Sequence, residues 1–359
     1  MAEAWLELRE PEGAFRRIEE WLRERRFFQP GGERLVADLY LGFGLSQTIR
    51  REQAPVPPEP CAALPLAACA IRPAASSVGG YTAEGCRVGR WEQTWTAEEY
   101  RAAVDAVRAA IARGDVYQVN LVQHLAAPFA GDPGSLPAIF EPLRPRRSTP
   151  FSSPGWTVVS ASPERFLARR GRRIWTEPIK GTRPLGRAEE LSTSEKDAAE
   201  HVMIVDLERN DLSRVCEAGS VRWPELMVTR ELAGVEHMVS TVEGTLREGV
   251  GLAEILEATF PGGSVTGAPK IAAVDLIAAL EPVGRGASMG ALGWVRGNGD
   301  FELALTIRTF AVAEGRIHLW VGGGIVWDSD PDQEVEESWT KAEPLLDAIR
   351  GRIPEAIAG

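Results

Sequence analysis

The stretch FELALTIRTFAVAEGRIHLWVGGGIV, residues 301–326, decides the fold class of this chain. β-Branched and aromatic residues recur through 301–313 and 316–326, and such runs are typical of strands. The Glu314–Gly315 pair between them predicts a tight hairpin turn, because glycine adopts the left-handed backbone at little cost. We therefore predict two consecutive strands, 301–313 and 316–326, paired antiparallel.

Outward from this hairpin, strands and long helices follow one another irregularly. Residues 286–295 predict another antiparallel strand, and 156–162 and 172–179 predict two strands that flank a turn at Gly171. Runs of strands with interspersed helices favour an α+β architecture over a doubly wound parallel sheet. Helices are expected at 96–114, 194–216, 252–259, 269–280 and 333–350.

The clearest helix boundaries lie at 96–114. Thr96 and Glu99 have the spacing of a capping box, and Gly114 suits a left-handed helix end. By contrast, residues 54–80 are rich in proline, which removes backbone donors and forbids a regular helix. We expect this segment to be a connection or an irregular edge.

Composition limits the classes of partner. The net charge of −11 argues against nucleic acid or an anionic membrane surface, since either needs a basic stripe. The acidic N-terminal segment does not resemble a signal peptide, and no apolar run is long enough to span a membrane. The cysteines at 61, 69, 86 and 216 are scattered, which predicts reduced thiols and a cytoplasmic location.

The rarity of lysine draws attention to Lys180. The chain has 40 basic residues, of which only four are lysines, and Lys180 lies in TEPIKGTRP, residues 176–184. A buried amine can lose its proton and act as a nucleophile, whereas a guanidinium cannot. Glu164, 16 residues earlier, would be its neighbour if a short turn joined the two strands. The pair is compatible with an acid and a nucleophile or with a plain ion pair. A pyridoxal phosphate site lacks an aspartate partner and a serine-rich phosphate cup.

The acidic tract 328–343 opens like a calcium loop, but Gln333 and Trp339 occupy positions that require glycine and glutamate. On the helix expected there, Glu337 and Lys341 share one face, where a surface salt bridge is the simplest interpretation. A carboxylate from another helix, such as Glu200, could join Glu337 at a Mg²⁺ ion completed by substrate and water.

Two glycine-rich segments can each be interpreted as a ligand-binding element or as local backbone geometry. FPGGSVTGAPK, 260–270, is not a Walker loop, yet its backbone amides could hold an anion. VGGGIV, 321–326, places three glycines in a strand, which indicates either close approach to a ligand or bulge geometry.

Eight ordered segments across 96–349 together resemble the chorismate-utilising enzymes, a group that includes anthranilate, aminodeoxychorismate, isochorismate and salicylate synthases. The resemblance implies two large antiparallel sheets packed face to face with helices outside. Residues 1–95 would form a short N-terminal region of the same fold, and residues 96–350 the chorismate-binding catalytic region. The segments are GDVYQVNL (114–121), SASPERFL (160–167), PIKGTRP (178–184), AEHVMIVDLERNDL (199–212), VEHMVST (235–241), FPGGSVTGAPK (260–270), LTIRT (305–309) and GGGIVWDSDPDQEVEESWTKA (322–342).

Two positions point to a branch of this group. Lys180 lies in PIKGT, as in aminodeoxychorismate synthases, where anthranilate synthases resemble PIAGT. Gln118 replaces a lysine that activates water in isochorismate and salicylate synthases. The resemblance therefore implies Mg²⁺-dependent amination of chorismate to 4-amino-4-deoxychorismate, towards p-aminobenzoate and folate. Anthranilate synthase component I and an isochorismate or salicylate type of synthase are the alternatives.

The resemblance also implies roles. Lys180 would add to the ring as nucleophile, Glu164 would be the general acid, and His237 would be a third catalytic position. Glu200 and Glu337 would hold Mg²⁺. Ammonia would come from a separate glutamine amidotransferase subunit, because no glutaminase signature is present. Residues implied to bind substrate are Gln118, Thr182, Ser264, Arg308, Gly323, Gly324 and Lys341.

Three residues depart from the family pattern, and one of them is Ser264, which replaces the commoner threonine. Ser288 stands where relatives carry an aromatic residue, and Glu208 adds a charge that we expect to face solvent. A non-catalytic binding subunit is the other class of protein to consider. It predicts loss of at least one of the main catalytic or metal-binding residues, and all are present.

Overall fold

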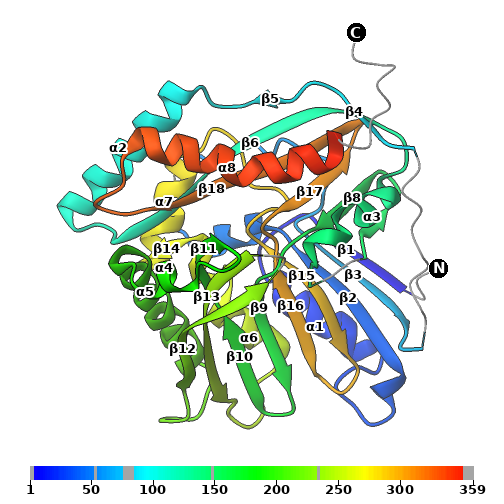
Figure 1. Cartoon of the computed structure of the whole chain (residues 1–359). Coiled ribbons are helices and arrows are strands. Elements are labelled where there is room, and N and C mark those ends of the chain that lie inside the picture. Colours follow the sequence, from blue (N-terminus) through cyan, green and yellow to red (C-terminus); the bar gives the residue numbers. More distant parts are fainter. Residues whose placement is uncertain (1–3, 52–54, 76–84, 147–148, 233–234, 351–359) are drawn as a thin grey trace.

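The strands of the computed structural model form two antiparallel sheets (Figure 1). The structure describes residues 4–51, 55–75, 85–146, 149–232 and 235–350. The larger sheet has ten strands in the order β1 (Ala4–Leu8), β3 (Ala67–Pro73), β2 (Leu35–Leu41), β15 (Ala291–Arg296), β16 (Phe301–Leu305), β9 (Arg165–Arg170), β10 (Arg173–Glu177), β13 (Val235–Thr245) and β11 (Ile179–Pro184), with β12 (Arg222–Leu232) also paired to β13.

The smaller sheet has eight strands, and the glycine-rich strand β18 lies near its centre. Strands β6 and β18 pair along ten residues, from Arg316 opposite Pro128 to Ile325 opposite Val119. The order is β14 (Gly267–Ala268), β6 (Gln118–Ala130), β18 (Arg316–Ile325), β17 (Thr309–Ala313), β8 (Trp156–Ser160) and β7 (Phe151–Ser153), with β4 (Arg87–Val88) and β5 (Glu92–Gln93) also paired to β6.

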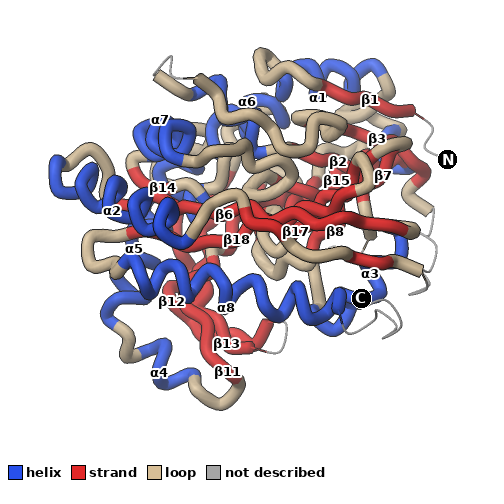
Figure 2. The backbone as a smooth tube through the Cα atoms, turned by 90° about the horizontal axis from the view of Figure 1, so that it is seen from above, coloured by secondary structure: helices blue, strands red, loops and turns tan. Residues whose placement is uncertain are grey.

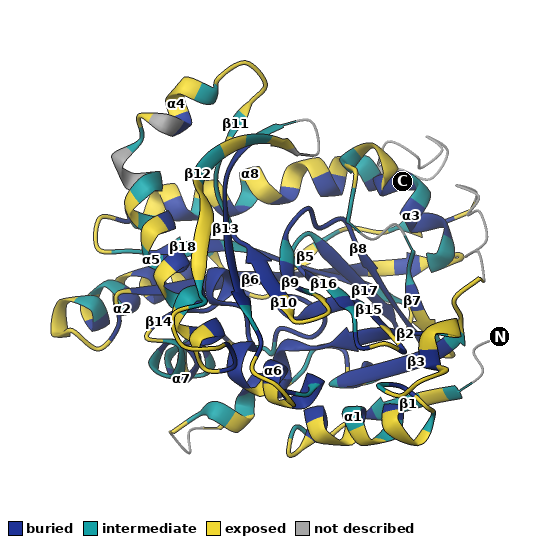
Figure 3. Ribbon diagram, turned by 90° about the horizontal axis from the view of Figure 1, so that it is seen from below, coloured by how far each residue is buried: buried dark blue, intermediate teal, exposed yellow. Residues whose placement is uncertain are grey.

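Helices lie outside the sheets. Helix α8 runs along the outer side of the smaller sheet with α2 near one end (Figures 1 and 2). Buried and exposed residues alternate along both helices (Figure 3). No helix within the described ranges is long and apolar enough to cross a membrane. The helices are α1 (Ala14–Glu24), α2 (Ala97–Arg113), α3 (Leu136–Phe140), α4 (Ala188–Ser192), α5 (Glu195–Ser213), α6 (Leu252–Thr259), α7 (Lys270–Leu280) and α8 (Pro331–Arg350), with 3₁₀ turns η1 (Gly32–Arg34), η2 (Phe43–Ile49), η3 (Pro133–Ser135), η4 (Glu141–Leu143) and η5 (Gly263–Val265).

The main core fills the space between the sheets. The rings of Tyr40 on β2 and Trp156 on β8 lie 5.9 Å apart, centroid to centroid, across that space. Alternate residues of β17 face opposite ways, as a strand requires: Ala311 belongs to the core between the sheets, and Phe310 to a second core beneath α3 and α8. The predicted α+β fold of two face-to-face antiparallel sheets with helices outside is confirmed.

Local signals were reliable. The capping box at α2 is present: Glu99 N donates to Thr96 Oγ1 at 3.2 Å, and Thr96 N donates to Glu99 Oε2 at 2.7 Å. Gly114 ends that helix with φ of 80°. The Glu314–Gly315 turn joins β17 to β18 as predicted.

The prediction of one strand over 301–313 was wrong, because the segment crosses between the sheets. Its first part, β16, belongs to the larger sheet and its second, β17, to the smaller one. The break includes Arg308, whose φ of 50° is left-handed and unusual for a residue with a side chain. An unbroken apolar run does not reveal such a crossing, because both halves are buried.

Two further predictions were wrong. Gly171 joins β9 to β10, and the strand at 156–160 belongs to the other sheet. The stretch 67–73 is no connection or edge, because β3 lies between β1 and β2. The apolar residues after the prolines supply this strand, and their burial depends on partners elsewhere in the chain. Residues 76–80 of the predicted connection lie outside the described residues.

Candidate active site

The predicted acid and amine meet at the end of the β9–β10 hairpin. Glu177 lies opposite Arg165 in that hairpin, so Glu164 is beside the chain that leads into β11. The Ser264 hydroxyl donates to Glu164 Oε1 at 2.7 Å, and Lys180 Nζ donates to the Ser264 carbonyl at 3.5 Å. Ser264 therefore contacts both groups, and Lys180 and Glu164 share one space.

Burial controls the charge of both groups. It raises the pKa of Glu164, although the Ser264 hydroxyl and the charge of Lys180 oppose the rise. Burial lowers the pKa of Lys180, against the opposing charges of Glu200 and Glu164. A raised pKa suits a carboxyl to act as a general acid, and a lowered pKa suits an amine to act as a nucleophile.

His237 lies on β13 opposite Thr182 of β11. Its Nδ1 is 2.9 Å from Thr182 Oγ1 and 3.2 Å from the Gly181 carbonyl, which suits a proton on Nδ1. Its Nε2 is buried and has no hydrogen-bond partner in the described part of the chain. Burial lowers the pKa of His237 to about 4, so the imidazole is neutral at neutral pH. A neutral ring with an open Nε2 can accept a proton.

Arg308 lies at the crossing between the sheets. The charge of Arg308 helps lower the pKa of His237. Burial lowers the pKa of Arg308, and the charge of Glu164 opposes that change. Both effects indicate that the guanidinium lies near His237 and Glu164. It makes no side-chain hydrogen bond or ion pair with the described residues. A partly buried guanidinium whose donors are not used by these residues is suited to bind a carboxylate of the substrate.

The glycines of β18 make room for side chains of the site. A Cβ on Gly324 would lie 1.9 Å from Gln118 Nε2, which is too close. A Cβ on Gly323 would lie 3.3 Å from both Lys341 Nζ and Glu334 Oε2. Gln118 is buried, and its Oε1 has no partner among the described residues. The glycines therefore allow polar groups to converge on this strand.

Lys341 and Glu337 form the surface ion pair that their spacing predicts. Lys341 Nζ is 2.6 Å from Glu337 Oε1, and the side chains are 46% and 48% exposed. Lys341 Nζ also donates to the Gly322 carbonyl at 2.9 Å, which holds the amine over β18. Glu334, on the same helix, is buried and accepts from the Ser329 hydroxyl at 2.7 Å.

Two carboxylates from different helices lie within electrostatic range of Lys180. The charges of Glu200 on α5 and Glu337 on α8 both act on the pKa of Lys180. The described residues contain no cluster of three or more potential ligands that would hold a metal ion alone. Two carboxylates from separate helices nevertheless suit Mg²⁺, which takes its remaining ligands from water and substrate.

One sequence prediction near the site was wrong. Glu208 does not face solvent: it is 3% exposed, and its Oε1 accepts from Gly263 N at 2.9 Å. Hydrophobic periodicity cannot reveal such a residue, because a buried charge resembles a surface charge in the pattern. Ser288 is also buried, and its hydroxyl donates to the Thr306 carbonyl at 3.3 Å.

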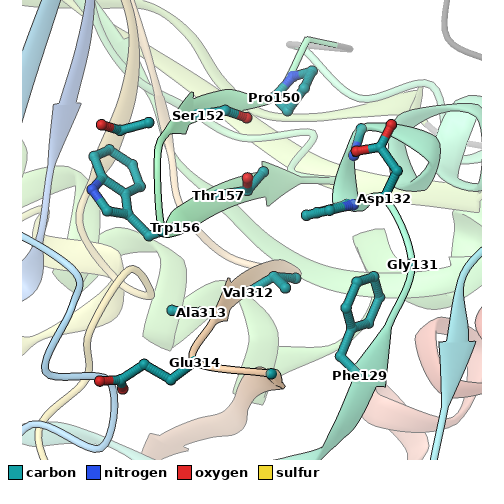
Figure 4. Close-up of a pocket in the computed structure, with 15 residues that line it drawn as sticks. Phe129, Gly131, Asp132, Pro150, Ser152, Trp156, Thr157, Val312, Ala313 and Glu314 are labelled. Carbon is teal, nitrogen blue, oxygen red and sulfur yellow. The ribbon is translucent and has the colours of Figure 1, made fainter.

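A cavity of about 710 Å³ lies elsewhere (Figure 4). It is lined by residues of β6, β8 and β17, including Phe129, Trp156 and Val312, by Glu314 in the turn after β17, and by Asp132 in the loop after β6. None of the predicted site residues lines it. The candidate chemistry therefore depends on converging side chains between the sheets, and this hollow does not contain it.

These side chains between two antiparallel sheets form a candidate site for an anionic substrate. Residues 79–347 match the profile of the chorismate binding enzymes, and the chain belongs to that family.

Two curated relatives are of similar closeness. Anthranilate synthase component 1 of Thermus thermophilus is 44% identical over 261 residues, which cover 70% of this chain and 56% of that protein. Aminodeoxychorismate synthase component 1 of Klebsiella aerogenes is 40% identical over 268 residues, covering 71% and 59%. The chain thus spans a little over half the length of these relatives.

Solved structures show the same fold. Anthranilate synthase component I from Streptococcus pneumoniae TIGR4 superposes with a TM-score of 0.76 at 24% identity, covering 86% of this chain and 80% of that one. A putative 2,3-dihydroxybenzoate-specific isochorismate synthase, DhbC, from Bacillus anthracis gives 0.74 at 23% identity, covering 97% and 92%.

Proposed function

We propose that this chain aminates chorismate to 4-amino-4-deoxychorismate, the reaction of an aminodeoxychorismate synthase component I. The observation that carries the proposal is the placement of the Lys180 amine beside Glu164 and Ser264. The chain is about equally identical to anthranilate and aminodeoxychorismate synthases, so overall identity does not distinguish between the two activities. The lysine is the chemical difference, because only para amination through a covalent intermediate requires an amine there.

The reaction proceeds by two allylic displacements. The Lys180 amine forms a bond to ring carbon C2, both ring double bonds shift around the ring towards C4, and the C4 hydroxyl leaves as water with the proton of Glu164. Ammonia then attacks C4, both double bonds shift back, and the bond from C2 to Lys180 breaks. The surplus proton of the new amine returns to Glu164. Chorismate and ammonia thus give the product and water, and both residues are restored.

The remaining residues bind and orient the substrate. Arg308, Lys341 and the backbone of Gly323 and Gly324 would bind its carboxylates, which offsets the net charge of −11 at short range. Gln118 and Thr182 would line the substrate ring. Thr182 would also orient His237. Glu200 and Glu337 would hold Mg²⁺, whose positive charge would fix one carboxylate.

A separate glutamine amidotransferase subunit would supply the ammonia, as the resemblance implies, and the protein would act in the cytoplasm. The cysteines are free, buried thiols, which suits a reducing compartment.

Product analysis tests the proposal. The protein is incubated with chorismate, Mg²⁺ and an ammonium salt, and the product is identified by chromatography and mass spectrometry. We expect 4-amino-4-deoxychorismate with its enolpyruvyl group retained. o-Aminobenzoate with release of pyruvate would show anthranilate synthase activity instead, and isochorismate would show that water is the nucleophile.

A further inference from the structure

A buried charge cluster behind the site has no part in the reaction proposed above. Glu208 and Asp211, both on α5, are 3% and 4% exposed. Lys270, at the start of α7, forms a close ion pair with Asp211 and donates to the Thr259 carbonyl at 2.8 Å. Burying three ionisable groups is costly unless they are paired. The cluster therefore requires an account of its own.

Glu208 holds the loop that precedes α7. Its Oε1 accepts from Gly263 N at 2.9 Å. A Cβ on Gly263 would lie 3.0 Å from that oxygen and 2.7 Å from Leu207 Cδ2, so the loop lies directly on α5. The Thr266 hydroxyl closes the loop by donating to the Gly262 carbonyl at 2.7 Å.

The next residue along this loop is Ser264. Its hydroxyl donates to Glu164 and its carbonyl accepts from Lys180. A displacement of Gly263 would therefore move the common partner of both reacting groups. Displacements of about 1 Å are enough to slow a positioned reaction severely.

We propose that Glu208 is a positioning residue, which fixes the Gly263 amide so that Ser264 holds Glu164 and Lys180 in reacting geometry. The inference rests on the proposed function, in which these two groups react. Glu208 itself touches neither of them.

The chemistry of the cluster indicates which substitutions are informative. Burial and the charge of Asp211 raise the pKa of Glu208 to about 8, and Lys270 and the Gly263 amide only partly offset them. Glu164 is the other charge that acts on Glu208. A neutral side chain of equal length can therefore replace Glu208, whereas a shorter one cannot reach Gly263.

The experiment compares Glu208→Gln with Glu208→Asp in the full chain, with Asp206→Asn as the control. Asp206 lies on the same helix, is exposed and pairs with Arg209. We expect Glu208→Gln to retain kcat for chorismate consumption within about threefold. Glu208→Asp should lower kcat about tenfold with little change in KM, because the lost hydrogen bond positions reacting groups and not the carboxylate-binding residues. The control should behave like the natural protein.

A second measurement needs no substrate. Limiting acetic anhydride labels Lys180 across a pH series, and mass spectrometry of the peptide gives its pKa. In Glu208→Asp the pKa of Lys180 should rise towards its ordinary value, because a displaced loop admits water. Glu208→Gln should leave it unchanged.

Three results would overturn the inference. In the first, Glu208→Asp retains kcat and Glu208→Gln loses it. In the second, the two variants have equal kcat. In the third, the pKa of Lys180 is unchanged in Glu208→Asp. Should Glu208→Asp not fold, Glu208→Met fills the volume without an acceptor and must show the same two changes. An anthranilate product with the predicted pattern would reject the proposed function and leave the positioning role intact.

Discussion

The site contains two glutamate–lysine pairs that differ in their surroundings. Glu164 and Lys180 lie between the sheets and share Ser264 as a partner. Glu337 and Lys341 lie one turn apart on α8, and each side chain is about half exposed. We call them the inner pair and the outer pair. The same two residue types occur in both, so the difference between them is one of environment.

Water makes the difference. At the outer pair, solvent stabilises both charges, so the pair can hold ions but contributes little to folding. At the inner pair, burial opposes both charges, raising the pKa of the acid and lowering that of the amine. Under the proposed function, desolvation would make the inner pair reactive, while the outer pair would serve binding.

The largest expected effect on kcat comes from replacing each of the two lysines, Lys180 and Lys341, by arginine. Lys180→Arg should lower kcat at least about 10³-fold, because a guanidinium keeps a positive charge but cannot act as the nucleophile. Lys341→Arg should lower kcat less than about tenfold and mainly raise KM for chorismate, since a cation remains. Steady-state kinetics with product identification measures both. Equal losses in the two variants would remove the distinction between the pairs.

Burial also controls His201, whose Nε2 lies 2.6 Å from the Ser240 hydroxyl. Burial and the charge of Lys180 lower the pKa of His201 to about 4. Between its ordinary pKa of about 6.5 and about 4, the unfolded chain binds a proton that the folded chain does not. The free energy of unfolding should therefore fall by about 3 kcal/mol as pH falls through this window.

His201→Gln removes this contribution, and the other titrating groups cancel in the difference between the two proteins. Urea unfolding at several pH values should show a shallower loss of stability on acidification in the variant. Parallel curves for the two proteins would show that His201 is protonated equally in both states.

Substitution of Glu164 and of Glu337 should affect different kinetic quantities. Glu164→Gln should lower kcat about 10²-fold, the scale of general acid catalysis, without changing the Mg²⁺ requirement. Glu337→Gln should raise the Mg²⁺ concentration for half-maximal rate about tenfold with a smaller change in kcat at saturation. Mg²⁺ titrations of the rate test both. A Mg²⁺ requirement unchanged in Glu337→Gln would exclude that residue as a ligand.

The smallest effect concerns stability at the outer pair. Lys341→Ala should change the free energy of unfolding by no more than about 0.5 kcal/mol, because exposed ion pairs of this spacing contribute only tenths of a kcal/mol. Urea unfolding at neutral pH measures it. A loss several times larger would mean that Lys341 supports the fold, and any rise in KM would then need another explanation.

Sequence and structure agree best where signals are local. The capping box of α2 and the turn at Glu314–Gly315 depend on residues a few positions apart, and both were predictable. The crossing at Arg308 was not, because the choice between two sheets depends on distant strands. The same limit applies to the site: motifs indicated its residues, but the buried state of Glu208 and its bond to Gly263 link positions 55 residues apart.

The sequence by itself determined the α+β class, most helices and the membership of the chorismate binding enzymes, because periodicity, caps and ordered motifs are written in adjacent residues. Only the tertiary structure decided which charges are buried. Ser264 reaches Glu164 across 100 positions of chain, and desolvation of that contact depends on both sheets. A pKa is a property of surroundings, and the surroundings exist only once the sheets have packed.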